Sequence, residues 1–454
     1  MSNITEVQPQ AQTEQEARPE WTSHIGFILA SLGSAVGLGN IWRFPYVMGK
    51  YGGGAFLLVY IVLMCAICII PLMCELLMGQ KFKLASVGAF QSVNKKLATL
   101  GWINVATVIL IAGFYFAVGG WIIHYILVYA TGKIPMGIDY SNYFNNFAAQ
   151  VKLPLIYATI FLVVSAIFPF RGVNQGIEKA NKVMMPAFLL MLLALVIVSQ
   201  TLSGAKEGLE FMFKPDFSKF NAEMFLIAFG QALFSLSVGM GAMMTYGSYL
   251  NKDTNLVESS YTIIFGETLI AISAGLMIFP AVFTYGLNPG EGPGLVFVTL
   301  PQVFEQLPFC GNFIAVLFFV LLLFAALTSS ISMLETAIAA FGESLNMTRQ
   351  KATLSVCAIV VLLMIPCTLS FGVMKDFQIF GKTIFDLFDF VTSTVMLPFN
   401  SLILCLVVGW LVKPSDEIVA KNAILYFIFN ILLKYVTPVL LLISLLCGLG
   451  IIKI

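Results

Sequence analysis

Eleven long, mostly apolar segments run through the chain, and they constrain its fold more than any other feature. A helix needs about 20 such residues to cross a bilayer. Only 10% of the 454 residues are charged and 59% are hydrophobic. The sequence therefore predicts an all-α integral membrane protein with eleven transmembrane helices. The predicted spans are residues 24–49, 53–79, 98–130, 155–170, 179–201, 222–249, 255–286, 311–345, 350–370, 382–411 and 423–452.

Lysine and arginine residues in the short loops predict the orientation in the membrane, because they favour the cytoplasmic side. They gather after the second, fourth and eighth segments, whereas loop 287–310 has none. Three lysines in loop 202–221 weaken this bias. The polar first 20 residues lack the apolar stretch of a cleavable signal. We therefore expect a cytoplasmic N-terminus and, after eleven spans, a C-terminus outside.

Composition also excludes several functions. The net charge of +1 gives no reason to expect a nucleic-acid partner. The eight cysteines lie mostly in apolar runs without metal-ligand spacing, and the two histidines are far apart. The sequence shows no paired nucleophile and base and no motif for an organic cofactor. We therefore do not expect an enzyme.

Two segments rich in glycine occupy corresponding places in the two halves of the chain. Val36-Gly37-Leu38-Gly39 lies within the first span and Val238-Gly239-Met240-Gly241 within the sixth. Glycine disfavours a helix, and broken backbone inside a membrane is tolerated only where it lines a cavity. Such a pair points to a substrate site in a transporter. The alternative is close helix packing through small residues.

Three longer motifs resemble the neurotransmitter:sodium symporter family. Residues 33–45 read GSAVGLGNIWRFP and are followed by GGGAF at 52–56, residues 230–241 read GQALFSLSVGMG, and residues 327–330 read LTSS. The resemblance covers nearly the whole chain. Within the family, the chain is most similar in kind to bacterial members that have eleven helices and carry leucine, tryptophan or tyrosine. It implies two inverted five-helix repeats plus one extra helix, with helices 1 and 6 unwound at mid-membrane, in a bacterial cytoplasmic membrane.

This fold implies a division of the chain. The expected parts are a cytoplasmic tail at 1–20, the first repeat at 21–201, an extracellular loop at 202–221, the second repeat at 222–411, and a cytoplasmic loop with the eleventh helix at 412–454.

The resemblance also implies a site for a zwitterionic amino acid. Family members that carry amines have Asp at the position of Gly37, so the substrate here is expected to bring its own carboxylate. Apolar walls select an apolar side chain. We therefore expect a hydrophobic L-amino acid, aliphatic or aromatic. The expected substrate residues are Ala35, Gly37, Leu38, Gly39, Ile111, Tyr115, Phe234, Ser235, Ser237, Met240, Ser329 and Met333.

Two sodium sites are implied by the same family pattern. The first would use Ala35, Asn40, Ser235 and Glu267, and the second would use Gly33, Val36, Ala325, Thr328 and Ser329. The seventh-helix position that is commonly Asn is Glu267 here, and Ala271 replaces a serine of chloride-dependent members. We therefore expect the Glu267 carboxylate to make chloride unnecessary. The roles of Glu75 and Glu335, also within helices, are left open.

Charged pairs on either side of this site resemble the family's gates. Arg43 is expected to face Asp389 on the outer side. On the inner side the expected residues are Arg18, Glu343, Trp21 and Tyr249. Together these features predict sodium-coupled symport by alternating access, with the lipid bilayer and a small amino acid as partners. The alternatives are a carrier of the same fold with another coupling ion or solute, and a membrane receptor or scaffold that transports nothing.

Overall fold

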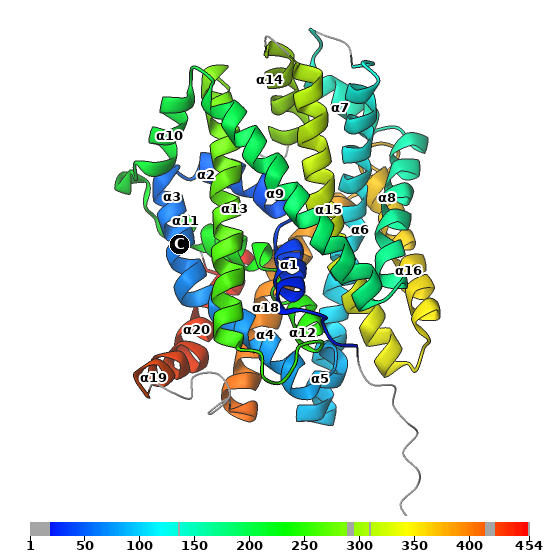
Figure 1. Cartoon of the computed structure of the whole chain (residues 1–454), viewed down its shortest axis with the longest axis vertical. Coiled ribbons are helices and arrows are strands. Elements are labelled where there is room, and N and C mark those ends of the chain that lie inside the picture. Colours follow the sequence, from blue (N-terminus) through cyan, green and yellow to red (C-terminus); the bar gives the residue numbers. More distant parts are fainter. Residues whose placement is uncertain (1–18, 135–136, 288–294, 308–309, 414–422, 453–454) are drawn as a thin grey trace, which may run out of the picture.

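The computed structural model describes residues 19–134, 137–287, 295–307, 310–413 and 423–452. These residues form a bundle of helices, with no strand beyond one isolated bridge between Ile379 and Lys382 in this part of the chain (Figure 1). The predicted all-α class is therefore confirmed.

Nine helical stretches in the described ranges are long and apolar enough to cross a membrane. Some of them combine consecutive helices, such as α3 (Gly54–Leu63) with α4 (Ile69–Phe82), and α17 (Ile384–Asp389) with α18 (Leu397–Val407). The nine are Gly54–Phe82, Lys95–Ala130, Lys152–Phe170, Val173–Gln200, Leu256–Thr284, Gly311–Ser344, Arg349–Leu369, Ile384–Val412 and Tyr426–Gly448.

The first predicted span is broken. Helix α1 (His24–Ala35) and the stretch Gly39–Lys50, which ends in α2 (Phe44–Lys50), meet at an angle of 50°. Val36 between them has extended backbone, with φ −88° and ψ 99°. The amides and carbonyls at this break are therefore released from the helical hydrogen-bond pattern, as the glycines of the first motif predict.

The sixth predicted span is broken in the same way. Helix α11 (Ala222–Ser235) and helix α12 (Ala242–Gly247) are separated by six residues. Gly239 and Gly241 have φ of 87° and 76°, in the left-handed region that glycine adopts without a steric penalty. The second glycine motif therefore marks a real interruption. The described residues give nine spans, or ten with the bent pair of the first span, and α11 is a shorter apolar helix.

Glu75 of α4 caps the broken backbone of the sixth span. Its completely buried carboxylate accepts hydrogen bonds from the amides of Gly239 at 2.7 Å, Met244 at 3.1 Å and Gly241 at 3.3 Å. Asn400 of α18 donates to the Gly239 carbonyl at 2.7 Å. Unpaired backbone groups at this depth would each cost several kcal/mol. These two side chains thus hold the interruption open, which assigns Glu75 the structural role that the sequence left undecided.

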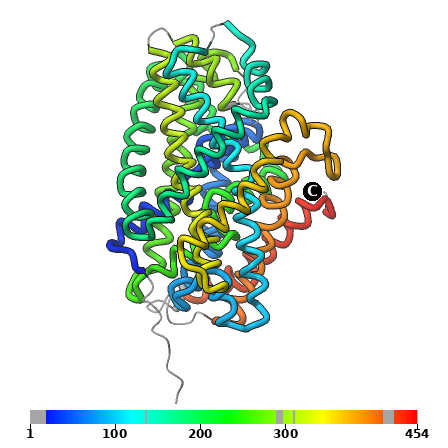
Figure 2. Tube along the Cα trace, turned by 90° about the vertical axis from the view of Figure 1, so that its right-hand side faces the viewer, coloured from blue at the N-terminus to red at the C-terminus, as the bar shows by residue number. Residues whose placement is uncertain are grey.

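The remaining helices surround these two broken spans. The longest, α6 (Ala98–Ala130) and α15 (Gly311–Ser344), pack against each other, and α15 also contacts α9 (Lys179–Gln200) and α8 (Lys152–Phe170). In Figure 2 the C-terminal helices, in orange and red, lie together on one side of the bundle, with α18 against α20 (Thr437–Gly448). The broken spans therefore lie among long helices that cross the whole molecule.

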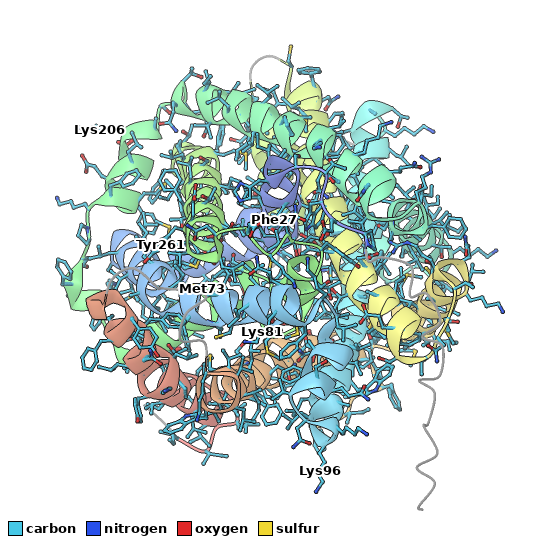
Figure 3. The ribbon with its side chains drawn as sticks, turned by 60° about the horizontal axis from the view of Figure 1, so that its bottom comes forward. Phe27, Met73, Lys81, Lys96, Lys206 and Tyr261 are labelled. Atoms are coloured by element: carbon cyan, nitrogen blue, oxygen red, sulfur yellow. The ribbon has the colours of Figure 1, made fainter. Side chains whose placement is uncertain are left out.

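Short helices cap the two ends of the bundle. Helices α7 (Tyr140–Ala148), α10 (Ala205–Phe213) and α14 (Leu300–Gln306) lie toward the upper end of Figure 1, and α5 (Ser86–Val93) and α19 (Ala423–Ile431) toward the lower end. Figure 3 brings the lower end forward and shows Lys96 at the periphery, whereas Phe27 lies among the helices. The other long helices are α13 (Leu256–Thr284) and α16 (Arg349–Leu369).

Gly79 allows α4 and α12 to pack backbone against backbone. A methyl group at this position would lie 2.0 Å from the Met244 carbonyl oxygen, which cannot move as a side chain can. We predict that Gly79→Ala destabilises the protein by about 1–3 kcal/mol, as overpacking of a core does. Thermal unfolding of the purified protein in detergent measures this.

The matched control is Gly342→Ala in α15, where the nearest atom to the added methyl group is 3.6 Å away. This variant should unfold at or slightly above the wild-type temperature, because alanine favours a helix over glycine by up to about 1 kcal/mol. Equal melting temperatures for the two variants would contradict the packing argument.

Candidate substrate and ion sites

One cavity lies where the two broken spans meet α6 and α15. It is lined by all twelve residues that the sequence proposes for the substrate, together with Ser34. They come from four parts of the chain that are distant in sequence: the break after α1, the middle of α6, the break after α11, and α15. The fold thus brings the predicted substrate residues together, while their individual roles remain predictions.

The polar end of the cavity contains a hydroxyl group that lacks a good partner. Tyr115 is buried and lies near Ser329 and the Leu38 amide, but its hydroxyl forms no well-aligned hydrogen bond within the described residues. A methyl group at Gly37 would lie 2.6 Å from the Ser329 hydroxyl and 3.0 Å from the Tyr115 hydroxyl. Any side chain at position 37 would therefore enter the space between these two donors.

The rest of the cavity wall is apolar. Ile111, Phe234, Met240 and Met333 face the cavity without any acidic or basic side chain beside them. Methionine is flexible and polarisable, so it adapts to ligands of different shape. This end of the cavity can accept an apolar side chain and offers no partner for a charged one.

Glu267 lies beside the break in the first span and is completely buried. It accepts hydrogen bonds from the Tyr60 hydroxyl at 2.6 Å and the Asn40 amide at 2.7 Å. The Ser235 hydroxyl lies 3.5 Å from the Asn40 amide oxygen. Gln231 donates to the Gly39 carbonyl at 3.0 Å. Three of the residues predicted for the first sodium site, namely Asn40, Ser235 and Glu267, therefore form one buried network, and Ala35 lines the adjoining cavity.

The residues predicted for the second sodium site also lie together. The Ser329 hydroxyl is 3.2 Å from the Gly33 carbonyl and 3.3 Å from the Val36 carbonyl. The Thr328 hydroxyl contacts the Ala325 carbonyl at 3.1 Å. All five groups are neutral oxygens, the ligand type that hard cations prefer. Clusters of three His, Cys, Asp or Glu side chains suited to a transition metal are absent from the described ranges.

A second cavity adjoins the substrate cavity. It is lined by Arg43 and Asp389, together with Tyr115 and Phe234 of the first cavity. The Arg43 guanidinium lies 5.3 Å from the centre of the Phe234 ring, and Asp389 accepts a hydrogen bond from Ser393 at 2.8 Å. In the described part of the chain Arg43 and Asp389 thus face one cavity without a direct ion pair.

The opposite end is closed by the segment before α1. Trp21 donates from its ring nitrogen to the Tyr246 carbonyl at 3.0 Å and from its amide to the Tyr249 carbonyl at 3.1 Å. Glu343 accepts a hydrogen bond from the Ala85 amide at 2.8 Å. Arg18, the predicted partner of Glu343, lies outside the described residues.

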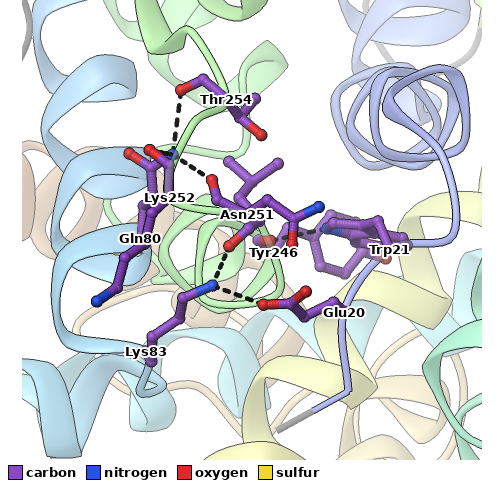
Figure 4. Close-up of polar contacts among 9 residues, drawn as sticks. Glu20, Trp21, Gln80, Lys83, Tyr246, Asn251, Lys252 and Thr254 are labelled. Carbon is purple, nitrogen blue, oxygen red and sulfur yellow. Dashed lines mark hydrogen bonds and ion pairs between the residues drawn. The ribbon is translucent and has the colours of Figure 1, made fainter.

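Further contacts at this end were not predicted from the sequence. Lys83 contacts the Leu250 carbonyl. It also pairs with Glu20 at 3.2 Å, as Figure 4 shows. Gln80 donates to the carbonyls of Asn251 at 2.7 Å and Thr254 at 3.1 Å. The loop after α12 is thus fixed to the end of α4. No sequence spacing indicates these contacts, because they join segments that are 63 to 174 residues apart.

Two buried carboxylates also hold elements together near this end. Glu335 of α15 pairs with Arg349 at 2.5 Å and accepts a hydrogen bond from Tyr249 at 2.6 Å. Glu178 pairs with Lys182 at 2.7 Å and accepts hydrogen bonds from Thr22. Glu178 and Lys182 have the spacing i, i+4, so this ion pair could have been predicted from the sequence. The ion pair gives Glu335 a structural role.

The structure thus contains two broken helices, clusters of buried oxygens at the breaks, and two adjoining cavities. This combination is typical of a class of membrane carriers. The model of the sodium:neurotransmitter symporter family matches residues 18–150 and 145–453. The chain belongs to this family, so it is a sodium-dependent membrane transporter and not an enzyme.

Individual relatives agree with this assignment. The chain is 38% identical to a sodium-dependent transporter of Bacillus subtilis, YhdH, over 96% of this chain and 99% of the relative. It is 36% identical to a sodium-dependent transporter of Haemophilus influenzae, over 89% and 92% of the two chains. The crystal structure of MhsT in complex with L-phenylalanine superposes with a TM-score of 0.88 at 40% identity, covering 95% of this chain and all of MhsT.

The second sodium cluster can be tested by removing its hydroxyls. We predict that Thr328→Ala combined with Ser329→Ala lowers sodium-driven uptake at least about tenfold, because the ion loses two of its five oxygens while its desolvation cost is unchanged. Uptake into proteoliposomes with a sodium gradient measures this.

The control is Ser330→Ala, which removes the next hydroxyl along α15. This group is also buried, but it bonds to Ser165 of α8 at 2.8 Å and so faces away from the cluster. It should leave the sodium dependence unchanged. Normal accumulation by the folded double variant would overturn the assignment of the second site.

Proposed function

We propose that this transporter carries hydrophobic L-amino acids into the cell by symport with sodium, through alternating access and without chloride. The observation that carries the proposal is the division of the central cavity. One end holds the Tyr115 and Ser329 hydroxyls, which lie beside the bare backbone of Gly37, and the other end is apolar. An L-amino acid with an apolar side chain has the same division.

The absence of a side chain at Gly37 supports a zwitterionic substrate. An ammonium group alone would need a nearby carboxylate, and none lines the cavity. A substrate carboxylate can instead accept from Tyr115 and from the freed amides of Leu38 and Gly39, and can share the first sodium ion. The ammonium group can donate to carbonyls at the broken ends of the two helices, among them those of Ala35 and Phe234.

The apolar wall supports an aliphatic or aromatic side chain. Burial of such a side chain stabilises the complex by about 1.5–3 kcal/mol, and a charged side chain would be desolvated without a partner. The structure of MhsT, which is 40% identical, was determined with L-phenylalanine. Phenylalanine is therefore the first substrate to test here.

Closures at both ends support alternating access. On one side the Arg43 and Asp389 cavity lies above Phe234, and on the other side Trp21 is bound to Tyr246 and Tyr249. Each must open in turn, so each closure is expected to be weak; a neutral hydrogen bond such as those of Trp21 is worth about 0.5–1.5 kcal/mol. We assign the Trp21 side to the cytoplasm and the C-terminus to the outside, in a bacterial inner membrane.

Charge balance supports independence from chloride. Two sodium ions with a neutral zwitterion bring uncompensated positive charge to mid-membrane, which costs several kcal/mol unless an anion offsets it. The Glu267 carboxylate already holds the Tyr60 and Asn40 donors that an anion would need. A carboxylate can also take up a proton after sodium leaves, which would ease the return of the empty carrier.

The decisive experiment is uptake of a panel of labelled amino acids into proteoliposomes, with and without a sodium gradient. Concentration of hydrophobic amino acids only with the gradient supports the proposal. Accumulation driven by a proton gradient alone would favour a carrier of the same fold with another coupling ion. Binding without accumulation would favour a receptor.

The zwitterion argument makes a separate prediction. L-Tryptophan and tryptamine differ only by the carboxylate, so unlabelled tryptophan should inhibit uptake at least about a hundredfold better, which corresponds to about 2.7 kcal/mol of binding. Competition for labelled L-phenylalanine uptake measures the ratio, with L-tryptophanamide as a control that keeps the size of the substrate and removes the charge of the carboxylate. Equal inhibition by the acid and the amine would overturn the carboxylate site.

The charge argument predicts that replacing chloride with gluconate leaves wild-type uptake unchanged. Glu267→Asn combined with Ala271→Ser should make uptake weak or dependent on chloride, because it removes the fixed charge and adds a hydroxyl donor. Glu258→Gln, a change of an acidic residue in the first turn of the same helix, is the control. A wild type that stops without chloride would show that Glu267 is not the compensating charge.

A further inference from the structure

Asn181 of α9 carries a buried amide oxygen that nothing satisfies. The side chain is completely buried, and its amide nitrogen donates to the Ile177 carbonyl one turn earlier, at 2.9 Å. Its Oδ1 atom has no hydrogen-bond partner within the described residues. A buried acceptor left in this way costs about 1–3 kcal/mol, so its retention requires an explanation.

The same oxygen lies against the second sodium cluster. A methyl group built on Gly33 would be 2.2 Å from Asn181 Oδ1 and 2.9 Å from Thr328 Cβ. The amide oxygen therefore occupies the space beside the Gly33 backbone, whose carbonyl is one of the proposed sodium ligands. Asn181 is not among the five residues of that cluster, and it comes from a different helix.

The position of Asn181 along α9 gives a direction. Glu178 precedes it by three residues and so lies about one turn closer to the end of the molecule where Trp21 closes the structure. Glu178 binds Thr22 and Lys182, and the Lys182 side chain is 40% exposed. A series of oxygen atoms therefore extends from the Gly33 carbonyl to Asn181 and on to Glu178, which binds Thr22 just before α1 begins.

The backbone around Asn181 is suited to local opening. It lies between Gly176 and Pro186, and residues Val173–Glu178 form a wide π-helical turn. Proline removes a helical hydrogen bond, and π-helical turns are less regular than α-helix. This stretch of α9 therefore separates from α1 more easily than an uninterrupted helix would.

From these observations we propose that the Asn181 side-chain oxygen is a transient ligand for sodium as the ion leaves the second site toward the cytoplasm. This inference rests on the proposed sodium-coupled function. An amide oxygen is a neutral, hard ligand, so it can replace a lost carbonyl or hydroxyl without holding the ion tightly. It lowers the barrier to release and is not part of the resting site.

Two variants separate the oxygen from its packing. Asn181→Leu keeps the branched shape and removes the oxygen, whereas Asn181→Thr keeps a branched side chain with a neutral oxygen and a donor for the Ile177 carbonyl. The control is Thr437→Val in α20, which removes another buried, unpaired oxygen in a different helix. Thermal unfolding in detergent establishes that each variant is folded.

The measurement is the release of radiolabelled L-phenylalanine from purified protein after dilution into buffer without sodium. We expect Asn181→Leu to slow release about tenfold, equivalent to 1.36 kcal/mol in the barrier, while the sodium concentration for half-maximal binding changes less than about threefold. Asn181→Thr and Thr437→Val should release within about threefold of the wild-type rate.

Release by Asn181→Leu at the wild-type rate would overturn the inference. Equal slowing in the Leu and Thr variants would also overturn it, because it would show that only the packing of the native amide matters. A wild type that binds L-phenylalanine without regard to sodium would instead overturn the proposed function together with this inference. Failure of this inference can be told apart from failure of the proposed function, because the first two outcomes leave sodium-dependent binding intact and the third does not.

Discussion

The need to satisfy backbone hydrogen bonds away from water controls this structure. Two helices break at mid-membrane, where lipid offers no partner for a free amide or carbonyl. The fold meets this cost with buried side chains from other helices, chiefly Glu75 on the amides of the sixth span and Asn400 on the Gly239 carbonyl. The groups that remain unpaired are then available to a ligand.

The distribution of charge follows from the same constraint. Carboxylates inside the bundle are each bound to donors: Glu75 to backbone amides, Glu335 to Arg349 and Tyr249, and Glu267 to Tyr60 and Asn40. Glu267 differs from the other two because it is itself one of the residues proposed for the first sodium site, together with its donor Asn40. In that proposal its charge offsets the charge of the bound cation.

The closures at the two ends are built differently. Toward one end Arg43 and Asp389 face a cavity without direct contact, so water or a ligand can lie between them. At the other end Trp21, Gln80 and Lys83 bind backbone carbonyls of the segment from Tyr246 to Thr254. Neutral hydrogen bonds such as those of Trp21 and Gln80 contribute about 0.5–1.5 kcal/mol each, and one from a charged donor such as Lys83 contributes about 1.5–3 kcal/mol. Opening that end therefore requires several modest contacts to break together.

The sequence by itself determined the spans, the two breaks and the set of residues around the cavity. Length and hydropathy set the spans, glycine marks the breaks, and the motifs at 33–45, 230–241 and 327–330 supply most of the lining. Only the tertiary structure decided the partners of Glu75 and Glu335, the contacts of Lys83 and Gln80 with the loop after α12, and the unpaired oxygen of Asn181. These features depend on which helices lie side by side. No local propensity or spacing encodes which side chain of one helix meets which group of another.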